Sequence, residues 1–599
     1  MKCARPARAC GAVVVAAVLS AVLSACAGLA TDSGVQQGAH VGEAAAQPVR
    51  AQPDGPVGGA TPEQIVRGFL RAGAGAGFDD DHSTARSFFA PNVKDDWLPD
   101  TGVKVYGEDS ALKVELLTPT TVRVTAPIVA ELDTDGRYRE TPAGTSAQAT
   151  FGMQKLDVGW RISVPQKGFG LWLSARDLDR IYRPFTIAYV SKSARMIVGD
   201  RRWFPITTGL ATTLAREQLA PPPAYLRGAV KTGVPTGTVL AVDAVPIQSG
   251  RALVDLSAPA LSADPDQRRA MWAQFVTTVM QVPSVTQISL TVEGARLELP
   301  DTPDRVSVLT TLGYQIDDPT PAETALLRAG SELSQVSADR PRSPDQPHRT
   351  SQPTPDPVGP RIPTGWVSLA LSPNGQEIAG IGGDHLDLAR WQGNRMFQLP
   401  RFGGGLTKPS YDSLSGLWVA GQVGGAPKVW VIDTSQSLGK VTKPREIPAP
   451  WLTGRTVVAL RVASDNQRVA MITSDRAGRD IHLVVAGIVR AANGAVVSLA
   501  AQPLRVAWSL TAATDLAWVD DSTLAVLGRV GTKSPIGPQL VEIGGRVTAL
   551  PPVAGARLVT STGGTRGVVV VTDQGRVMAR VGNGWQQLQA GTDFLIPGE

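Results

Sequence analysis

Cysteine is nearly absent from this sequence of 599 residues, and its three copies, Cys3, Cys10 and Cys26, all lie in the first 26 positions. The rest of the chain therefore has no disulfide framework and no thiolate metal cluster. The apolar run from about Gly11 to Leu23 is shorter than the roughly 20 residues that a stable membrane-spanning helix needs. A basic start, this apolar run and the small residues after it are typical of a removed export signal.

An excess of positive charge is also missing once the leader is set aside. The formal net charge of +5 falls to +2 without the three cations Lys2, Arg5 and Arg8, so nothing predicts a nucleic-acid partner. The sequence lacks the G-x-S-x-G, H-E-x-x-H and P-loop motifs. It has only five histidines, of which His40 and His348 lie in segments of low predicted order. We therefore expect no catalytic residue, no cofactor and no resident metal.

The leader ends in Leu23-Ser24-Ala25-Cys26, which resembles the bacterial lipobox. The resemblance implies a diacylglyceryl group on the Cys26 thiol, cleavage between Ala25 and Cys26, and acylation of the new amino terminus. Two or more acyl chains hold a protein stably on a membrane. Residues 1–25 would then be a signal peptide, and the apolar-poor stretch 26–60 a flexible tether on the extracytoplasmic face. The alternative is a soluble exported protein, because Ala25-Cys26-Ala27 also fits an A-x-A cleavage site.

Residues 61–183 are expected to form the first folded domain. Thr61, Pro62 and Gln64 predict a helix start, and alternating strands follow a second short helix. Two helices before a curved antiparallel sheet resemble the ketosteroid-isomerase-like cone, an α+β fold whose pocket can bind ligands or stay idle. The acidic run Asp79, Asp80 and Asp81 with His82 suggests metal or acid–base chemistry, but a solvated loop between two helices is the favoured interpretation.

Residues 184–305 predict a second α+β domain. Strands around Val239–Val242 are expected to pair with Leu253–Leu256, and Met271, Trp272, Phe275, Val276 and Val279 lie at helical spacing. Their order, with VPTGTVL, GRALVDLS, the long helix and the VEG hairpin, resembles the GerMN domain of sporulation and spore-germination proteins. That resemblance implies an interaction module associated with surface assemblies.

Residues 306–363 read as a proline-rich connector, with a hairpin at Ala325–Ser337 that could close a propeller. From 364 to 599, weak repeats of roughly 40 to 55 residues predict an all-β propeller. Trp366, Trp391, Trp418, Trp430, Trp518 and Trp585 are expected in blade cores. Six blades are favoured over five, with the tail GTDFLIPGE paired to the early hairpin. His385 beside Asp384 and Asp387 suggests a metal or triad remnant, but a blade loop is favoured because metal sites need ligands that converge from separate places.

The chain contains, in order, the lipobox, the ketosteroid-isomerase-like unit, the GerMN unit and a propeller with the turn Ser372-Pro373-Asn374-Gly375 (SPNG). With this order, over nearly the whole chain, it resembles the actinobacterial lipoprotein LpqB family. The resemblance implies a multidomain lipoprotein that is not an enzyme. It also implies binding to the extracellular domain of the MtrB sensor histidine kinase, with effects on two-component signalling, cell-wall homeostasis and division. A propeller that binds cell-wall glycan and a cell-envelope hydrolase remain as alternatives.

Overall fold

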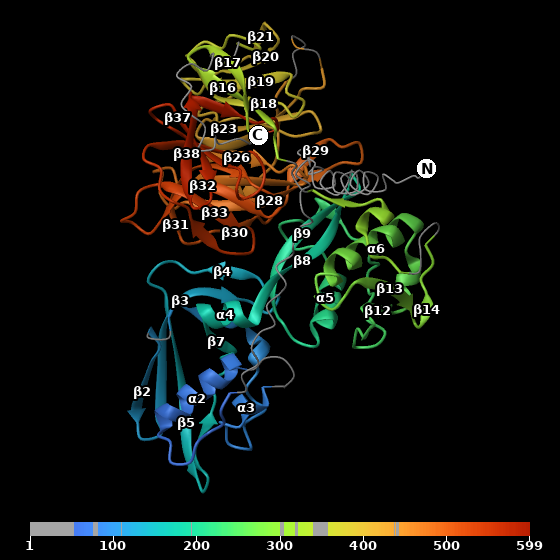
Figure 1. Ribbon diagram of the computed structural model, residues 1–599, viewed down its shortest axis with the longest axis vertical. Helices are drawn as coiled ribbons and strands as arrows, with labels where there is room; N and C mark the ends of the chain where they lie inside the picture. Colours follow the sequence, from blue (N-terminus) through green and yellow to red (C-terminus); the bar gives the residue numbers. More distant parts are fainter. Residues whose placement is uncertain are drawn as a thin grey trace, which may run out of the picture. The chain divides into compact units, whose positions relative to one another are not determined.

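The computed structural model describes residues 53–75, 82–108, 111–192, 194–299, 305–317, 321–338, 357–436, 438 and 443–598 (Figure 1). The first helix begins as the sequence predicts. The amide of Thr61 donates to Gln64 Oε1 at 2.8 Å, and the amide of Gln64 donates back to the Thr61 hydroxyl at 3.3 Å. This reciprocal cap satisfies amides that the first helical turn leaves without partners.

The N-terminal region is a mixed sheet with helix α2 packed on it. The strand order is β6-β5-β3-β1-β7, and only the β1–β7 pair in it is parallel. Strands β2 and β4 pair with the two ends of the long strand β3. The elements are α2 (Pro62–Gly75), α3 (Ser83–Arg86), β1 (Val103–Tyr106), β2 (Lys113–Thr118), β3 (Thr121–Leu132), β4 (Tyr138–Glu140), β5 (Ser146–Leu156), β6 (Gly159–Val164), β7 (Leu171–Ser174) and α4 (Ala175–Ile181).

The second region has two sheets with helices α5 and α6 beside strand β8 (Figure 1). The sheet orders are β10-β8-β9-β15 and β11-β12-β13-β14. The predicted helical stripe of Met271 and Trp272 is buried in α6, which confirms that it belongs to the core. The elements are β8 (Tyr182–Ser191), β9 (Met196–Pro205), α5 (Leu210–Leu219), β10 (Val230–Lys231), β11 (Ile247–Gln248), β12 (Arg251–Leu256), α6 (Pro265–Val279), β13 (Gln287–Val292), β14 (Ala295–Arg296) and β15 (Gln315–Ile316).

Two details of this region differ from the sequence prediction. The expected pairing of Val239–Val242 with Leu253–Leu256 is present but short: Leu240 bridges Leu256, and the Ala241 amide donates to the Asp255 carbonyl oxygen at 2.8 Å, whereas Val239 and Val242 are exposed. Strand β12 also pairs with β11 and β13. The predicted connector 306–363 is also divided, since β15 joins β9 of this region.

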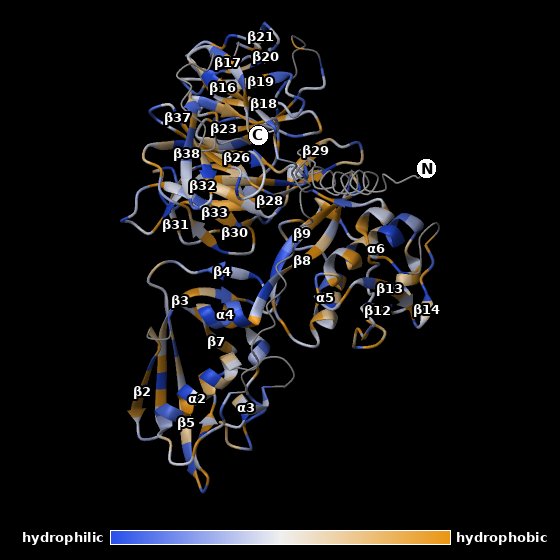
Figure 2. Ribbon diagram, in the orientation of Figure 1, coloured by the Kyte–Doolittle hydropathy of each residue, from blue (hydrophilic) through white to orange (hydrophobic). Residues whose placement is uncertain are grey.

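The C-terminal region consists of sheets whose innermost strands contact one another in a ring. Successive contacts run from β18 through β22, β26, β31, β35 and β39 back to β18. Several of the strands are buried along their whole length, and Figure 2 shows hydrophobic colours around β28, β32 and β33. The strands are β16 (Thr324–Ala329), β17 (Glu332–Ser337), β18 (Trp366–Leu371), β19 (Glu377–Gly382), β20 (Leu388–Gln392), β21 (Arg395–Gln398), β22 (Ser410–Tyr411), β23 (Gly416–Val423), β24 (Ala426–Asp433), β25 (Arg445–Glu446), β26 (Thr456–Val462), β27 (Arg468–Ser474), β28 (His482–Arg490), β29 (Val496–Leu499), β30 (Leu504–Val506), β31 (Leu510–Trp518), β32 (Thr523–Val530), β33 (Gly537–Glu542), β34 (Val547–Ala549), β35 (Ala556–Ser561), β36 (Val568–Thr572), β37 (Arg576–Val581), β38 (Gly584–Ala590) and β39 (Asp593–Leu595).

The chain closes this ring with its own tail. Strand β39 pairs antiparallel with β16, so the tail and the early hairpin form one sheet, as the sequence predicts. The buried Arg328 guanidinium ties that sheet to the next one, because it contacts Asp593 at 3.4 Å and donates to the carbonyl oxygens of Ile362, Pro363 and Trp366. A closed ring leaves no free inner edge for pairing with other chains.

Buried polar contacts fix the order of neighbouring sheets elsewhere in the ring. They satisfy groups that would otherwise be costly to remove from water. The contacts are Tyr411 Oη to Glu377, Arg490 to Asp412 and Arg461 to Asp515, each at 2.8 Å, and the Val559 amide to Asp515 at 3.0 Å. Trp391, Trp418, Trp430 and Trp518 are buried in the sheets, whereas Trp366 and Trp585 are half-buried.

Apolar and polar contacts link the three regions. The apolar core of the second region continues into the sheets of β26 to β34. The joining pairs are Arg137 with Asp200 at 3.2 Å, the Trp203 indole with the Gly544 carbonyl at 2.9 Å, and Arg546 with Asp179 at 2.5 Å.

Candidate functional site

The strongest predicted site residue, Cys26, lies outside the described residues, as do Asp79, Asp80 and Asp81. His82 is described, and its ring meets the Trp97 ring edge to face at 5.5 Å. Among the described residues, no group of three or more histidine, cysteine, aspartate or glutamate side chains is placed to hold a metal ion.

The side chains of Asp384, His385 and Asp387 make contacts that stabilise their own loop. His385 Nδ1 lies 2.8 Å from the Leu406 carbonyl oxygen, and this contact requires a proton on Nδ1. Asp384 and Asp387 both face Arg401, at 3.3 and 2.8 Å, rather than the imidazole. The hydrogen bond from Arg401 lowers the pKa of the Asp387 carboxyl. These contacts hold the loop in place. The imidazole and the two carboxylates do not form the arrangement of a nucleophile beside a base.

The candidate functional site is a hollow at one end of the ring, which we call the axial hollow. Its volume is about 190 Å³. Every sheet of the ring contributes to it, because its lining follows the end of each innermost strand. Representative lining residues, one from each sheet, are Pro373, Asp412, Asn466, Asp520, Thr562 and Pro597.

Asp412 organises one wall of the axial hollow. Its buried carboxylate accepts hydrogen bonds from Arg490 at 2.8 Å and from the Trp418 indole at 2.9 Å. It also accepts the amides of Leu414 and Gly416, at 2.9 and 2.6 Å. These partners use up the acceptor capacity of the carboxylate. Asp412 therefore shapes the turn and is not available to a ligand.

Asp520 is the second carboxylate of the axial hollow. Its Oδ1 accepts from the amide and hydroxyl of Ser522, at 2.9 and 3.2 Å. Beside it, burial raises the pKa of the Asp521 carboxyl, Arg468 acts against that rise, and the charge of Asp520 adds to it. Among the described residues that line this hollow there is no lysine, arginine or histidine. The axial hollow is thus suited to hydrogen-bond donors and cationic groups.

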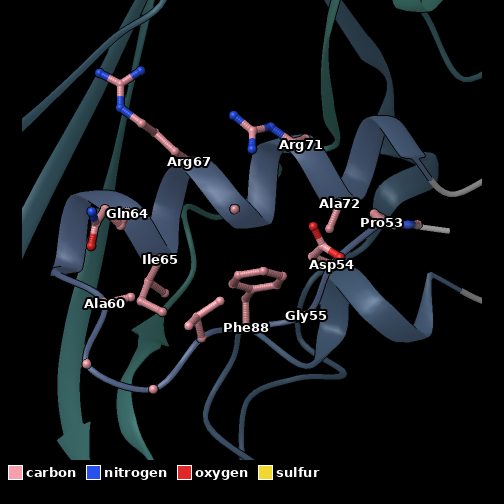
Figure 3. A pocket seen from close by; sticks show the side chains of 14 residues that line it. Pro53, Asp54, Gly55, Ala60, Gln64, Ile65, Arg67, Arg71, Ala72 and Phe88 are labelled. Atoms are coloured by element: carbon pink, nitrogen blue, oxygen red, sulfur yellow. The ribbon is translucent and has the colours of Figure 1, made fainter. Parts of the chain in front are cut away.

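A second hollow, which we call the helix hollow, lies beside α2 and has a volume of about 500 Å³ (Figure 3). It is lined by the segment that leads into α2 and by one face of that helix. Its rim includes Arg67 and Arg71, so its charge differs in sign from that of the axial hollow.

Comparison with protein families accounts for most of the chain. Residues 55–179 match the model described as the lipoprotein LpqB N-terminal domain, and residues 346–597 match the lipoprotein LpqB beta-propeller domain. The chain belongs to the lipoprotein LpqB family. Between these two matches, residues 186–298 match the model described as sporulation and spore germination.

Whole-length relatives agree with this assignment. "Lipoprotein LpqB" of Thermobifida fusca is 27% identical, over 98% of this chain and 99% of the relative. "Lipoprotein LpqB" of Streptomyces coelicolor is 27% identical, over 99% and 98%. TolB from Acinetobacter baumannii is a similar solved structure, with 14% identity, 52% of this chain and 82% of that chain covered, and a TM-score of 0.31. Among the described helices, none combines the length and apolar composition needed to cross a bilayer.

Neither hollow was predicted from the sequence. The signal for the axial hollow was present in the repeated polar turns SPNG, SDNQ, DDST and TGGT, which occupy equivalent places after the innermost strands. Each turn alone looks like an ordinary hairpin connection. Only ring closure brings them to one end of the region.

Proposed function

We propose that this protein is a lipoprotein of the cell envelope, anchored through Cys26 on the extracytoplasmic face of the membrane. It binds the extracellular domain of an MtrB-like sensor histidine kinase and modulates two-component signalling that affects cell-wall homeostasis and division. We also propose six blades for the propeller, a ketosteroid-isomerase-like cone for residues 61–183 and a GerMN domain for residues 184–305. Membership of the lipoprotein LpqB family carries this proposal.

The proposed mechanism is recognition by a tethered domain. Cys26 precedes the first described residue, Pro53, by 27 positions, which reach at most about 90 Å when fully extended. Confinement to one membrane raises the effective concentration of two partners, so a weak contact can be occupied. Binding shifts the kinase only if one kinase state is bound more tightly than the other.

The anchor can be tested in cell membranes. Substitution Cys26→Ala removes the thiol that would carry the diacylglyceryl group, so the protein should leave the membrane fraction on sedimentation. Mass spectrometry of the parent should find acyl chains on the mature amino terminus. An unmodified thiol there, or a Cys26→Ala variant that stays with the membranes, contradicts the anchor.

The axial hollow is the proposed contact site for the kinase, because it offers Asp520 and backbone groups from every sheet and has no cation among its lining residues. Substitution Asp520→Lys should weaken binding of the purified kinase ectodomain by about tenfold or more, since like charges replace a complementary pair. The matched control is Asp384→Lys, in an exposed loop of the same region. Equal binding by both variants and the parent removes the axial hollow from the proposal.

Glycan binding is the second candidate function. The axial hollow is lined by the polar side chains of Ser413, Ser464 and Asn466 beside the largely buried rings of Tyr411 and Trp518, and a few polar groups of this kind can orient a small ligand. Retention of soluble cell-wall fragments by the parent, with no binding of the kinase ectodomain, favours this function over the first.

A further inference from the structure

The helix hollow is shaped by the approach of a glycine-rich segment to one face of α2. Residues Pro53 to Ala60 run along the helix and line the hollow together with Gln64, Gly68 and Ala72 (Figure 3). Positions four apart lie above one another on a helix, so these three residues form a single stripe. Gly68 leaves the middle of this stripe without a side chain.

The floor of the helix hollow is apolar. Ile65, Ala72 and Phe88 line it, and each is almost fully buried. A Cβ atom at Gly68 would lie 2.4 Å from the Phe88 ring, so the ring takes up the space that a side chain would need. On the opposite wall, the Val57 side chain is 68% exposed. Because the floor residues are almost fully covered, the apolar surface that this hollow exposes to solvent comes mainly from the Val57 side chain.

The rim of the helix hollow is positively charged. Arg67 and Arg71 are exposed one helical turn apart. Neither guanidinium has an ion pair or side-chain hydrogen bond with another described residue. Asp54 is the one carboxylate of the lining and lies at the end near Ala72 (Figure 3). Two unpaired arginines on the rim of a hollow that also exposes the Val57 side chain are complementary to an anionic amphiphile.

The place of the helix hollow in the chain identifies the source of such an amphiphile. Pro53, the first described residue, is itself part of the lining. The proposed lipid attachment at Cys26 precedes it by only 27 positions. With Cys26 anchored as proposed, the segment that lines this hollow is the first described part of the chain after the anchor, and basic residues near an anionic membrane are attracted to it.

We propose that the helix hollow binds an anionic membrane phospholipid, with its phosphate on Arg67 and Arg71 and its first acyl carbons against the exposed Val57 side chain. This contact would hold the first domain against the membrane surface beside its own anchor. It uses the proposed anchor only to bring the hollow close to lipid, and it is independent of kinase binding.

The test uses the mature chain from position 26 with Cys26→Ala, so that no acyl chain of its own contributes. This protein should sediment with vesicles of phosphatidylcholine mixed with phosphatidylglycerol and not with phosphatidylcholine alone. Substitutions Arg67→Gln and Arg71→Gln together should weaken that binding by about 25-fold, since each cation near an anionic surface contributes about fivefold. Substitution Val57→Ser should give a smaller loss, because it removes only apolar contact.

The matched control removes the same charge elsewhere, with Arg476→Gln and Arg479→Gln on an exposed turn of the propeller region. Equal losses in the control and the helix variant would mean a general charge effect and would overturn the proposal. So would equal binding to neutral vesicles. Full competition by soluble glycerol 3-phosphate, with no effect of Val57→Ser, would assign the site to a free anion instead. Unchanged thermal midpoints confirm that the exposed substitutions leave the fold intact.

Discussion

The two hollows of this protein are built in opposite ways. The axial hollow collects turns from sheets that span residues 322 to 598, and no lysine, arginine or histidine is among its lining residues. The helix hollow is formed within residues 53 to 88 and has two arginines at its rim. One depends on closure of an entire ring and the other on a single helix and the segment before it. A change at the chain terminus should therefore separate them.

Their charges point to different partners. A surface with the Asp520 carboxylate and backbone groups favours hydrogen-bond donors and cations, whereas two neighbouring arginines favour phosphate. The proposed function, a lipoprotein that lies on a membrane and contacts a neighbour, would use both kinds of surface at separate places. Each hollow can be altered without touching the residues of the other.

The largest expected effect comes from removing the closing strand. Truncation after Thr592 deletes Phe594, Leu595 and Ile596, which are all almost fully buried. Loss of about 1.5–3 kcal/mol for each buried side chain amounts to about 5–9 kcal/mol, which is comparable with the whole stability of a domain. The propeller region should unfold at a much lower urea concentration, and the axial hollow should be lost with it.

Binding to anionic vesicles provides the internal control for this truncation, since the helix hollow shares no residue with the tail. The truncated protein should still bind the mixed vesicles. A truncated protein with parental stability would contradict the role of β39 in closing the ring.

The sequence predicts the elements of the fold better than their assembly. The cap at Thr61, the buried stripe of α6 and the repeated hairpins follow from residue spacing, because helices and strands have fixed periods. The pairing of the tail with Ala325–Ser337 could also be predicted, since the propeller repeats left both segments without a partner. The short strand β15, which returns to β9 across more than a hundred residues, had no such signal.

The site residues show the same contrast between what local sequence predicts and what only the assembled fold reveals. A loop role for His385 was favoured from sequence, and its contact with Leu406 agrees with that interpretation. The sequence did not predict the structural role of Asp412. Its partner Arg490 lies 78 positions away, and only the packing of neighbouring sheets brings the two side chains together. Long-range contacts of this kind depend on topology, which local patterns do not encode.

An intermediate effect is expected from neutralising Asp412. Substitution Asp412→Asn leaves the buried Arg490 guanidinium without its counter-charge, and breaking such a pair costs about 3–5 kcal/mol. Chemical denaturation should show this loss in the propeller region. The control Asp384→Asn breaks an exposed pair with Arg401, which is worth about 0–1 kcal/mol. Similar losses in the two variants would mean that Asp412 is not a structural residue of the axial hollow.

The smallest expected effect concerns Asp521, beside the axial hollow. Burial raises the pKa of its carboxyl above the ordinary value of 3.8, and the charge of Asp520 adds to the rise against the opposing effect of Arg468. The folded state therefore holds this proton more tightly than the unfolded state. The stability that it contributes is fully present below pH 3.8 and is lost as the pH rises through the raised pKa.

Substitution Asp521→Asn removes the ionisable group, so the variant should be slightly more stable than the parent at pH 7, and this gain should shrink as the pH is lowered. Urea denaturation at several pH values measures both quantities. Substitution Asp520→Asn is the matched control, and it should act in the same direction but less strongly, because it lowers the pKa of Asp521 without removing its charge. A variant Asp521→Asn whose advantage grows toward low pH would show that burial does not penalise this carboxylate. The surroundings of Asp521, beside the axial hollow, would then be more accessible to water than its burial indicates.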